Sequence, residues 1–389
     1  MTDRHTSASL GKTTILSASP IFLACAGRMV ALLQAWILMA GLVAGPTPIL
    51  AQDGADGHNR ANHVRVLTQN MYVGSDFTAL NTAKTIPELL AAVTTTYQDI
   101  LARKPQERVA AMAREIAKAR PDFVALHEAM ILRAGNPPTT VELDLLQSML
   151  DELTALGEHY ALVTTVNGVD ALVQSTLGFA IHLTDRDAIL MRTDAGIATI
   201  DFTSQNFPTS RITPLPPPLP PLVTPGGYVS IDAIVRGLPM RFVSVHLDPA
   251  CAGASASSCS GPALAIQLAQ TNELLQLAGN TTLPLVFAGD FNTAANDPSH
   301  PSHVIYQALI NAGLTDAWER GNPGFTCCQD EDLLNAKSKL SFRIDLILFR
   351  GDFGVGELNL IGDKPSDKTP SSLWPSDHAG VTATLTAPE

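Results

Sequence analysis

The chain consists of short segments whose apolar side chains repeat at every second residue, separated by longer segments with a helical repeat. Residues 63–70 (HVRVLTQN) carry apolar or β-branched side chains at alternate positions, which predicts a strand. Residues 106–120 carry apolar side chains three and four positions apart, which predicts a helix that ends at Pro121. By the same criteria we predict strands at 122–127, 188–192, 228–235, 241–246, 285–288, 344–349 and 380–385, and helices at 141–156, 262–277 and 305–312.

The order of these elements indicates the fold class. Strands alternate with helices in some parts of the chain and follow each other directly in others, which favours a layered α/β fold with mixed sheets over a purely parallel sheet. The sequence contains no internal repeat and no second domain boundary, so we expect one domain over residues 62–389. Residues 213–225 (TPLPPPLPPLVTP) contain seven prolines, which predicts an extended, polyproline-like surface loop. A docking segment for proline-recognising modules is the alternative.

The first part of the chain has the pattern of an export signal. An apolar run at residues 30–44 (VALLQAWILMAGLVA) follows Arg28 and ends at Gly45 and Pro46. A run of about 15 apolar residues suits the core of a signal peptide better than a membrane span of about 20. We expect residues 1–52 to be a signal peptide or hydrophobic leader and the protein to be secreted or periplasmic. An uncleaved membrane anchor is the alternative.

Charge and cysteine content narrow the possible functions. The formal net charge is −12, which argues against a protein that coats nucleic acid by charge alone. It does not exclude an enzyme that meets a phosphate at a metal ion, because the ion supplies the local positive charge. Four cysteines follow the leader, Cys251, Cys259, Cys327 and Cys328, without the spacing of a structural zinc site. Disulfides are therefore favoured, and three pairings remain open.

Polar side chains recur where predicted strands end. A strand that stops on a polar residue holds that side chain rigidly at the rim of a sheet, where it can bind a ligand. The six segments with this property are those of Asn70, Glu128, His246, the Gly-Asp-Phe-Asn motif with Asp290 and Asn292, Asp345, and the pair Asp377 and His378.

The order of these residues, N…E…H…GDFN…RID…SDH, resembles the endonuclease/exonuclease/phosphatase superfamily over residues 64–385. The resemblance implies a four-layer α/β sandwich with two facing mixed β-sheets and an active site at one end. It also implies a catalytic domain that cleaves phosphoesters with the help of one divalent ion, Mg²⁺ or alternatively Mn²⁺ or Ca²⁺. Glu128 would be the principal metal carboxylate, with Asn70 and Asp377 beside the same ion.

The remaining residues receive catalytic roles from the same resemblance. Asp290 would orient or deprotonate the attacking water, and Asn292 would hold the water or a phosphoryl oxygen. His378 would act with Asp345 as an imidazole–carboxylate pair. His246 would donate to the phosphoryl oxygens as charge develops on them.

Three further residues near these motifs receive structural interpretations. Asp185 and Asp187 could be partners of His246, but we interpret them as part of a solvated turn. His127 precedes Glu128 and should point to the opposite face of its strand.

We therefore predict an exported, metal-dependent phosphodiesterase, with a nuclease as the leading interpretation. The alternatives are a sphingomyelinase-like phospholipase C or a sugar-phosphate phosphatase, and a binding protein that has kept the fold. The expected partner is a phosphodiester substrate, either nucleic acid or phospholipid. We expect a monomer without a stable protein partner.

Overall fold

The structure is a computed structural model that describes residues 63–249, 259, 261–318 and 323–387 of the chain. The predicted leader at residues 1–52 and Cys251 lie outside the described residues. None of the described helices is both long enough and apolar enough to cross a membrane.

One sheet has eight strands in the order β15-β16-β1-β2-β6-β3-β4, with β5 paired to β6. Its centre is β1 (His63–Asn70), which pairs in parallel with β2 (Phe123–His127) and antiparallel with β16 (Gly380–Thr386). The other strands are β3 (Ile131–Gly135), β4 (Thr140–Asp144), β5 (Tyr160–Gln174), β6 (Ala180–Arg192) and β15 (Gly354–Ile361). We call this sheet A.

The second sheet, sheet B, has six strands in the order β13-β14-β12-β11-β10-β7. Only β11 and β12 pair in parallel, so both sheets are mixed, as predicted. The strands are β7 (Ile197–Asn206), β10 (Gly227–Val235), β11 (Leu238–His246), β12 (Leu285–Asp290), β13 (Thr315–Asp316) and β14 (Asp345–Arg350).

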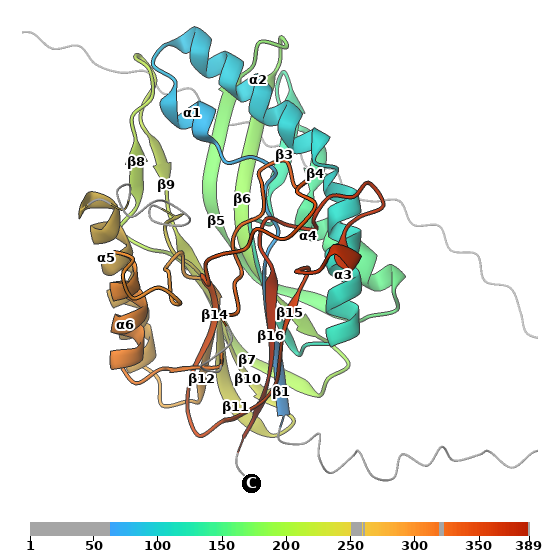
Figure 1. Ribbon diagram of the computed structural model, residues 1–389, viewed down its shortest axis with the longest axis vertical. Helices are drawn as coiled ribbons and strands as arrows, with labels where there is room; N and C mark the ends of the chain where they lie inside the picture. Colours follow the sequence, from blue (N-terminus) through green and yellow to red (C-terminus); the bar gives the residue numbers. More distant parts are fainter. Residues whose placement is uncertain (1–62, 250–258, 260, 319–322, 388–389) are drawn as a thin grey trace, which may run out of the picture. The chain divides into compact units, whose positions relative to one another are not determined.

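The sheets face each other and are covered by helices, which makes four layers (Figure 1). An apolar core lies between the sheets, where the ring of Phe123 stacks on that of Phe242 at 5.0 Å between ring centroids. Sheet A packs its other face on α2 (Ile86–Ala102), α3 (Pro105–Ala119) and α4 (Leu145–Ala155). Sheet B packs its other face on α5 (Gly261–Gly279) and α6 (His303–Asn311). The predicted four-layer α/β sandwich is confirmed.

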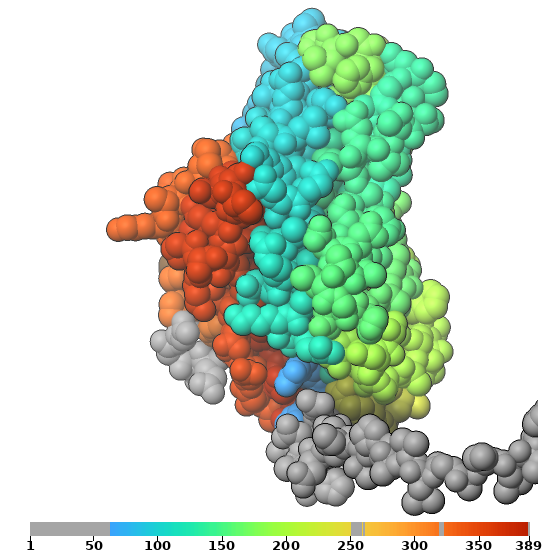
Figure 2. Space-filling model, turned by 90° about the vertical axis from the view of Figure 1, so that its right-hand side faces the viewer, coloured from blue at the N-terminus to red at the C-terminus, as the bar shows by residue number. Residues whose placement is uncertain are grey.

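Two segments late in the chain, one between β13 and β14 and one between β15 and β16, lie against α2 and α3, although they are more than 200 residues away in sequence. Figure 2 shows them in orange and red beside the blue and teal helices. Arg103 Nε donates to the Glu331 carbonyl at 3.1 Å, and the backbone N–H of Ser371 donates to Glu107 at 3.2 Å. The Ser371 contact fixes the chain that leads into Asp377.

Some element predictions were wrong. Residues 140–144 form strand β4 rather than the start of a helix, because Asp144 caps α4 by accepting from the backbone N–H of Gln147 at 3.0 Å. The proline-rich segment is a largely exposed loop over residues 214–221, as predicted, but its ends pair as the short strands β8 (Arg211–Thr213) and β9 (Leu222–Thr224). The sequence analysis also missed α2, β5 and β7.

Candidate active site

Three of the predicted residues lie side by side because β11 and β12 end, and the antiparallel β14 begins, at the same edge of sheet B. His246 on β11 is in register with Asp290 on β12, and Asp290 is in register with Asp345 on β14. Gly289 permits this arrangement, since a Cβ at that position would overlap the backbone of Val245. Strand pairing therefore brings an imidazole and two carboxylates to one end of sheet B.

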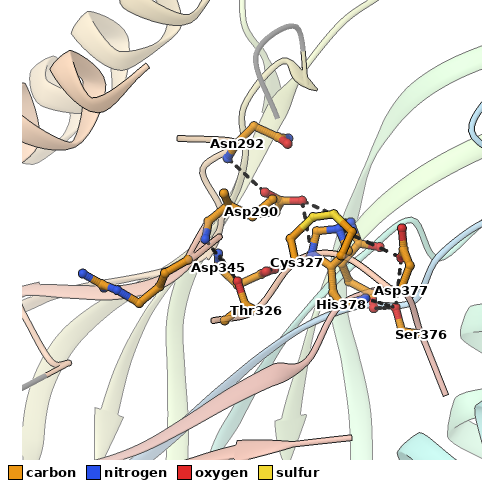
Figure 3. Close-up of a disulfide and its surroundings, with 12 residues drawn as sticks. Asp290, Asn292, Thr326, Cys327, Asp345, Ser376, Asp377 and His378 are labelled. Atoms are coloured by element: carbon orange, nitrogen blue, oxygen red, sulfur yellow. Dashed lines mark hydrogen bonds and ion pairs between the residues drawn. A yellow bond between two sulfur atoms is a disulfide. The ribbon is translucent and has the colours of Figure 1, made fainter. Parts of the chain in front are cut away.

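His378 and Asp345 form the predicted imidazole–carboxylate pair (Figure 3). His378 Nδ1 lies 2.8 Å from Asp345 Oδ2, and both side chains are buried. Thr326 Oγ1 accepts from the backbone N–H groups of Ile344 (3.1 Å) and Asp345 (3.0 Å). Burial alone would lower the pKa of His378, but Asp345 and Asp377 raise that pKa well above its usual value of 6.5.

His246 has its own carboxylate partner, Asp187, whose Oδ1 lies 3.0 Å from His246 Nδ1. The interpretation of Asp187 as part of a solvated turn was wrong, because the residue is buried within β6. The prediction for His127 was also wrong. Its Nδ1 lies 3.4 Å from Asp187 Oδ1, and its ring is 5.5 Å from the His246 ring. Simple alternation failed here because Glu128, the next residue, has left the strand with a φ of 56°.

The Asp187 carboxylate and the His246 imidazole stabilise each other's charged forms. Burial raises the pKa of Asp187, but His246 and His127 lower it below its usual range. Burial lowers the pKa of His246, but Asp187 and Asp290 raise it well above 6.5. His246 is therefore a cation beside a fixed anion at neutral pH.

Asp290 lies between the two histidines. Its Oδ2 is 3.9 Å from both His246 Nε2 and His378 Nδ1, and it accepts from Asn70 Nδ2 at 3.1 Å. Burial and the nearby Asp345 raise the pKa of Asp290. A carboxylate with a raised pKa is a better proton acceptor than a free aspartate, as the predicted role requires.

Glu128 approaches the same point from sheet A. Its Oε1 accepts from Asn70 Nδ2 at 2.9 Å, and its Oε2 accepts from the backbone N–H of Val73 at 2.9 Å. Asn70 Oδ1 is itself occupied by the backbone N–H of Tyr72 at 2.9 Å. Asn70 thus presents its NH₂ group to Glu128 and Asp290, which favours a positioning role over binding an ion through its oxygen.

Asp377 completes the acidic side of the site. Burial raises its pKa to about 7, and the negative charge of Glu128 contributes to the rise. Ser376 Oγ holds this segment in place, because it donates to the Asn70 carbonyl at 2.7 Å and accepts from the backbone N–H of His378 at 3.1 Å.

The residues fit a divalent cation that prefers oxygen ligands. Glu128 and Asp377 are carboxylates whose mutual repulsion a cation would relieve, and one or two carboxylates plus a substrate phosphate are how Mg²⁺ is usually held. Glu128 and Asp377 belong to no group of three potential ligand atoms within 4.8 Å of one another, whereas two such groups outside the disulfide occur among the described residues. They are the histidine–carboxylate groups of His246 and His378, whose geometry already has an acid–base explanation.

Arg108 is a functional residue that the sequence analysis missed. It is fully buried in α3, and its guanidinium donates to the carbonyls of Met71 (2.8 Å), Tyr72 (2.8 Å) and Pro375 (3.1 Å). These carbonyls belong to the segments that follow Asn70 and precede Asp377. Arg108 therefore ties together the two segments that carry the acidic side of the site.

Asn292 lies in the turn after β12, with a φ of 49°. Its backbone N–H donates to Asp290 Oδ1 at 2.9 Å, and its Nδ2 donates to the Leu247 carbonyl at 2.8 Å. Gln267 on α5, which is buried, donates to the Asn292 carbonyl at 2.9 Å. The side chain thus links the ends of β11 and β12 beside Asp290.

The cysteines near the site are oxidised. Cys327 is joined to Cys328 in a disulfide, and Cys327 forms a backbone bridge with His378 (Figure 3). Cys259 is also disulfide-bonded. The preference for disulfides over zinc is confirmed for these three cysteines.

Comparison with known proteins identifies the family to which the chain belongs. The model of the endonuclease/exonuclease/phosphatase family matches residues 67–378. No curated protein matches the sequence. A family protein from Beutenbergia cavernae has a TM-score of 0.53 at 17% identity, with 84% of this chain and 72% of that chain covered.

Two structures from Bacteroides thetaiotaomicron are similar over nearly their whole length. A family protein has a TM-score of 0.52 at 15% identity, with 84% of this chain and 98% of that chain covered. A mannosyl-6-phosphatase has a TM-score of 0.50 at 17% identity, with 83% and 99% covered. At these sequence identities the similarity supports the fold alone. The substrate has to be inferred from the residues of the active site.

Proposed function

Because the chain belongs to the endonuclease/exonuclease/phosphatase family, we propose that it is a divalent-metal-dependent hydrolase of phosphodiester bonds. The observation that carries the proposal is the position of Asp290. It lies between two imidazoles that are each backed by a carboxylate, and Asn70 links it to Glu128. An arrangement of this kind supplies a proton acceptor and two cationic donors at one point.

Each group has a role in that reaction. Asp290 accepts a proton from the attacking water. His246 and His378, both cationic, donate to the phosphoryl and leaving oxygens as negative charge develops there. Glu128 and Asp377 would hold the ion, which adds further stabilisation of that charge when bound. Asn70 and Arg108 act as positioning residues.

The natural substrate stays a prediction. Within this class the sequence predicts a nuclease, with a phospholipase C-like or sugar-phosphate esterase as the alternative. A protein that only binds its ligand is less well supported, because every position that the chemistry needs carries a competent side chain.

The test is hydrolysis of bis-p-nitrophenyl phosphate, a generic diester, and of p-nitrophenyl phosphate, the monoester. Each is offered with Mg²⁺, Mn²⁺ or Ca²⁺. We expect hydrolysis of the diester that requires the ion and falls by about 10²–10⁴-fold in His378→Ala. His182→Ala is the matched control, because His182 also pairs with an aspartate, Asp170 at 2.7 Å, but on the exposed surface of β5 and β6. A protein that hydrolyses only the monoester, or neither compound, contradicts the proposal.

We also propose that the enzyme works outside the cytoplasm. The apolar run at residues 30–44 supports this, as do the disulfides, which persist in oxidising compartments. N-terminal sequencing of the exported protein is the test. A mature chain that begins near residue 53 supports a cleaved signal, and an intact leader on a cytoplasmic protein contradicts export.

A further inference from the structure

A cavity of about 680 Å³ extends from the active site to residues that the mechanism does not use. Asp290, Glu128 and His378 line it at one end. Beyond them its walls come from three segments that are distant in sequence: α1 (Thr78–Thr82), β5 and the hairpin of β8 and β9. Figure 1 shows these segments on the side of the domain where β5 and β6 extend past the other strands.

Beyond the active site, most of the residues that line the cavity are apolar. Phe77 and Leu80 contribute from α1 and its N-cap, and Leu215 and Leu222 contribute from the hairpin. All four side chains are only partly buried, so part of their apolar surface is free for a ligand. Free apolar surface next to a catalytic centre favours a ligand that has an apolar part.

On the strands β5 and β9, alternation of side chains directs every second residue into the cavity. On β5, Val169 and Val173 line the cavity, whereas Leu172 points to solvent and is 60% exposed. On β9, Leu222 lines the cavity, whereas its neighbour Val223 is 51% exposed. Each inward residue therefore has an outward neighbour of similar size and polarity, which provides a matched control.

The charge of the cavity does not suit a polyanion. Of the described residues that line it, Arg211 is the only lysine or arginine. Its guanidinium is already held by Asp248, with Nε–Oδ2 and Nη2–Oδ1 distances of 3.1 and 2.5 Å. Asp76 and Glu331 add negative charge. A nucleic acid needs several lysine or arginine contacts to its phosphates, and this cavity offers none that is unpaired.

We propose that the cavity is a subsite for an alkyl chain esterified to the phosphate that the enzyme hydrolyses. The inference rests on the proposed function, because the phosphate lies beside Asp290 while the chain lies between α1, β5 and the hairpin. It makes the substrate an alkyl or lipid-like phosphoester rather than a nucleic acid. Leu80, Val173 and Leu222 become specificity-determining residues.

Binding of methyl phosphate and octyl phosphate, measured by calorimetry on the whole domain with Mg²⁺, tests the subsite without requiring turnover. Each methylene that enters the cavity should tighten binding by up to about fourfold until the cavity is filled. We expect octyl phosphate to bind at least about tenfold more tightly than methyl phosphate. Leu222→Asp should abolish that preference, whereas Val223→Asp should keep it. Leu80→Asp, on the part of the wall that α1 contributes, should behave like Leu222→Asp.

Thermal unfolding of each variant identifies a folding defect, and binding of methyl phosphate should be the same in all of them. Equal affinities for the two phosphates in the unmodified protein, or equal loss in Leu222→Asp and Val223→Asp, would overturn the subsite. Displacement of octyl phosphate by a single-stranded oligonucleotide at lower concentration would also overturn it and favour a nuclease.

Hydrolysis separates this inference from the proposed function. Hydrolysis of methyl and octyl p-nitrophenyl phosphate diesters at equal kcat/KM would leave the phosphodiesterase in place and overturn the subsite. Binding of octyl phosphate without hydrolysis of any diester would support the subsite and overturn the phosphodiesterase. Cleavage of sphingomyelin or phosphatidylcholine vesicles would identify a membrane as the source of the chain. Cleavage of the soluble octyl ester alone would identify a free ester, and both results support an alkyl subsite.

Discussion

The two halves of the active site are positioned in different ways. The acid–base half stands on neighbouring strands of sheet B, where register alone aligns His246, Asp290 and Asp345. The cation half stands on segments outside the strands, where Glu128 has a φ of 56° and Asp377 precedes β16. Side chains such as Arg108 hold those segments. The comparison indicates that backbone pairing preorganises His246, Asp290 and Asp345. The cation groups, and His378 on the segment that carries Asp377, depend instead on a few buried hydrogen bonds.

The largest expected effects come from neutralising one central carboxylate in each half of the active site. Both Asp290→Asn and Glu128→Gln should lower kcat/KM by about 10³-fold, within the range for lost acid–base or electrostatic catalysis. Their effects on ion binding should differ. At a free ion concentration 100 times its Kd, the ion should stabilise Asp290→Asn by about 2.7 kcal/mol, as it does the unmodified protein.

Glu128→Gln should lose this stabilisation, because it removes a ligand charge. Urea unfolding with and without Mg²⁺ or Mn²⁺ measures the difference. An ion that stabilises Glu128→Gln fully and Asp290→Asn not at all would place the cation at the histidine half instead.

The same division explains how much of the site the sequence revealed. His246 and Asp290 end strands whose apolar pattern is local, and Asp345 begins another, so the strands themselves were predicted. Their convergence on one site followed from the family resemblance. The four-layer fold followed from the order of elements together with the family resemblance. Asp187 was assigned to a turn because the apolar segment at 188–192 suggested that the strand began there, whereas β6 begins at Ala180.

The rest depended on contacts that a sequence does not display. An arginine on a predicted helix is usually exposed. No feature of the neighbouring sequence indicates that the Arg108 guanidinium donates to three backbone carbonyls. The strand β5 was missed because it has polar residues on both faces of a long ribbon. The cavity could not be predicted from the sequence, because its walls come from segments that meet only in the folded chain.

The next largest effect concerns the link between Asp187 and His246. Asp187→Asn should lower kcat/KM by about 10²-fold, because the imidazolium loses its orienting anion. Since Asp187 raises the pKa of His246, the substitution should lower that pKa, and the alkaline limb of the pH–rate profile should move to lower pH. An unchanged limb would mean that His246 does not act as the cationic donor.

The same pair predicts how stability depends on pH. The raised pKa of His246 stabilises the folded protein fully below about pH 6.5, and the contribution is lost as the pH rises through the folded-state pKa. The lowered pKa of Asp187 contributes above about pH 4 and is lost as the pH falls through its folded-state pKa. Asp187→Asn should therefore reduce the free energy of unfolding most between about pH 4 and pH 6.5, where both contributions are fully present.

A smaller effect on activity should follow from loosening the cation half. Arg108→Met keeps the length of the side chain but leaves the Met71, Tyr72 and Pro375 carbonyls without their donor. We expect the affinity for the ion to fall by about 10–100-fold and the free energy of unfolding to fall by at least about 3 kcal/mol. Arg114→Met, on the exposed face of the same helix, is the matched control. Ion affinity equal to that of Arg114→Met would show that Arg108 stabilises the fold without positioning Glu128 and Asp377.

The smallest effect on activity should come from Thr326, which tests whether the acid–base half depends on side chains at all. Thr326→Val keeps the shape of the residue but removes the oxygen that accepts from the backbone of Ile344 and Asp345. Two buried N–H groups lose their acceptor, so the free energy of unfolding should fall by about 1–3 kcal/mol. We nevertheless expect kcat/KM to change by less than about tenfold, because the pairing of β12 with β14 still holds Asp345 against His378. Thr326→Ser, which retains the acceptor, should restore the stability. A loss of activity as large as that of Asp187→Asn would mean that hydrogen bonds from side chains, and not strand register, position this half of the site as well.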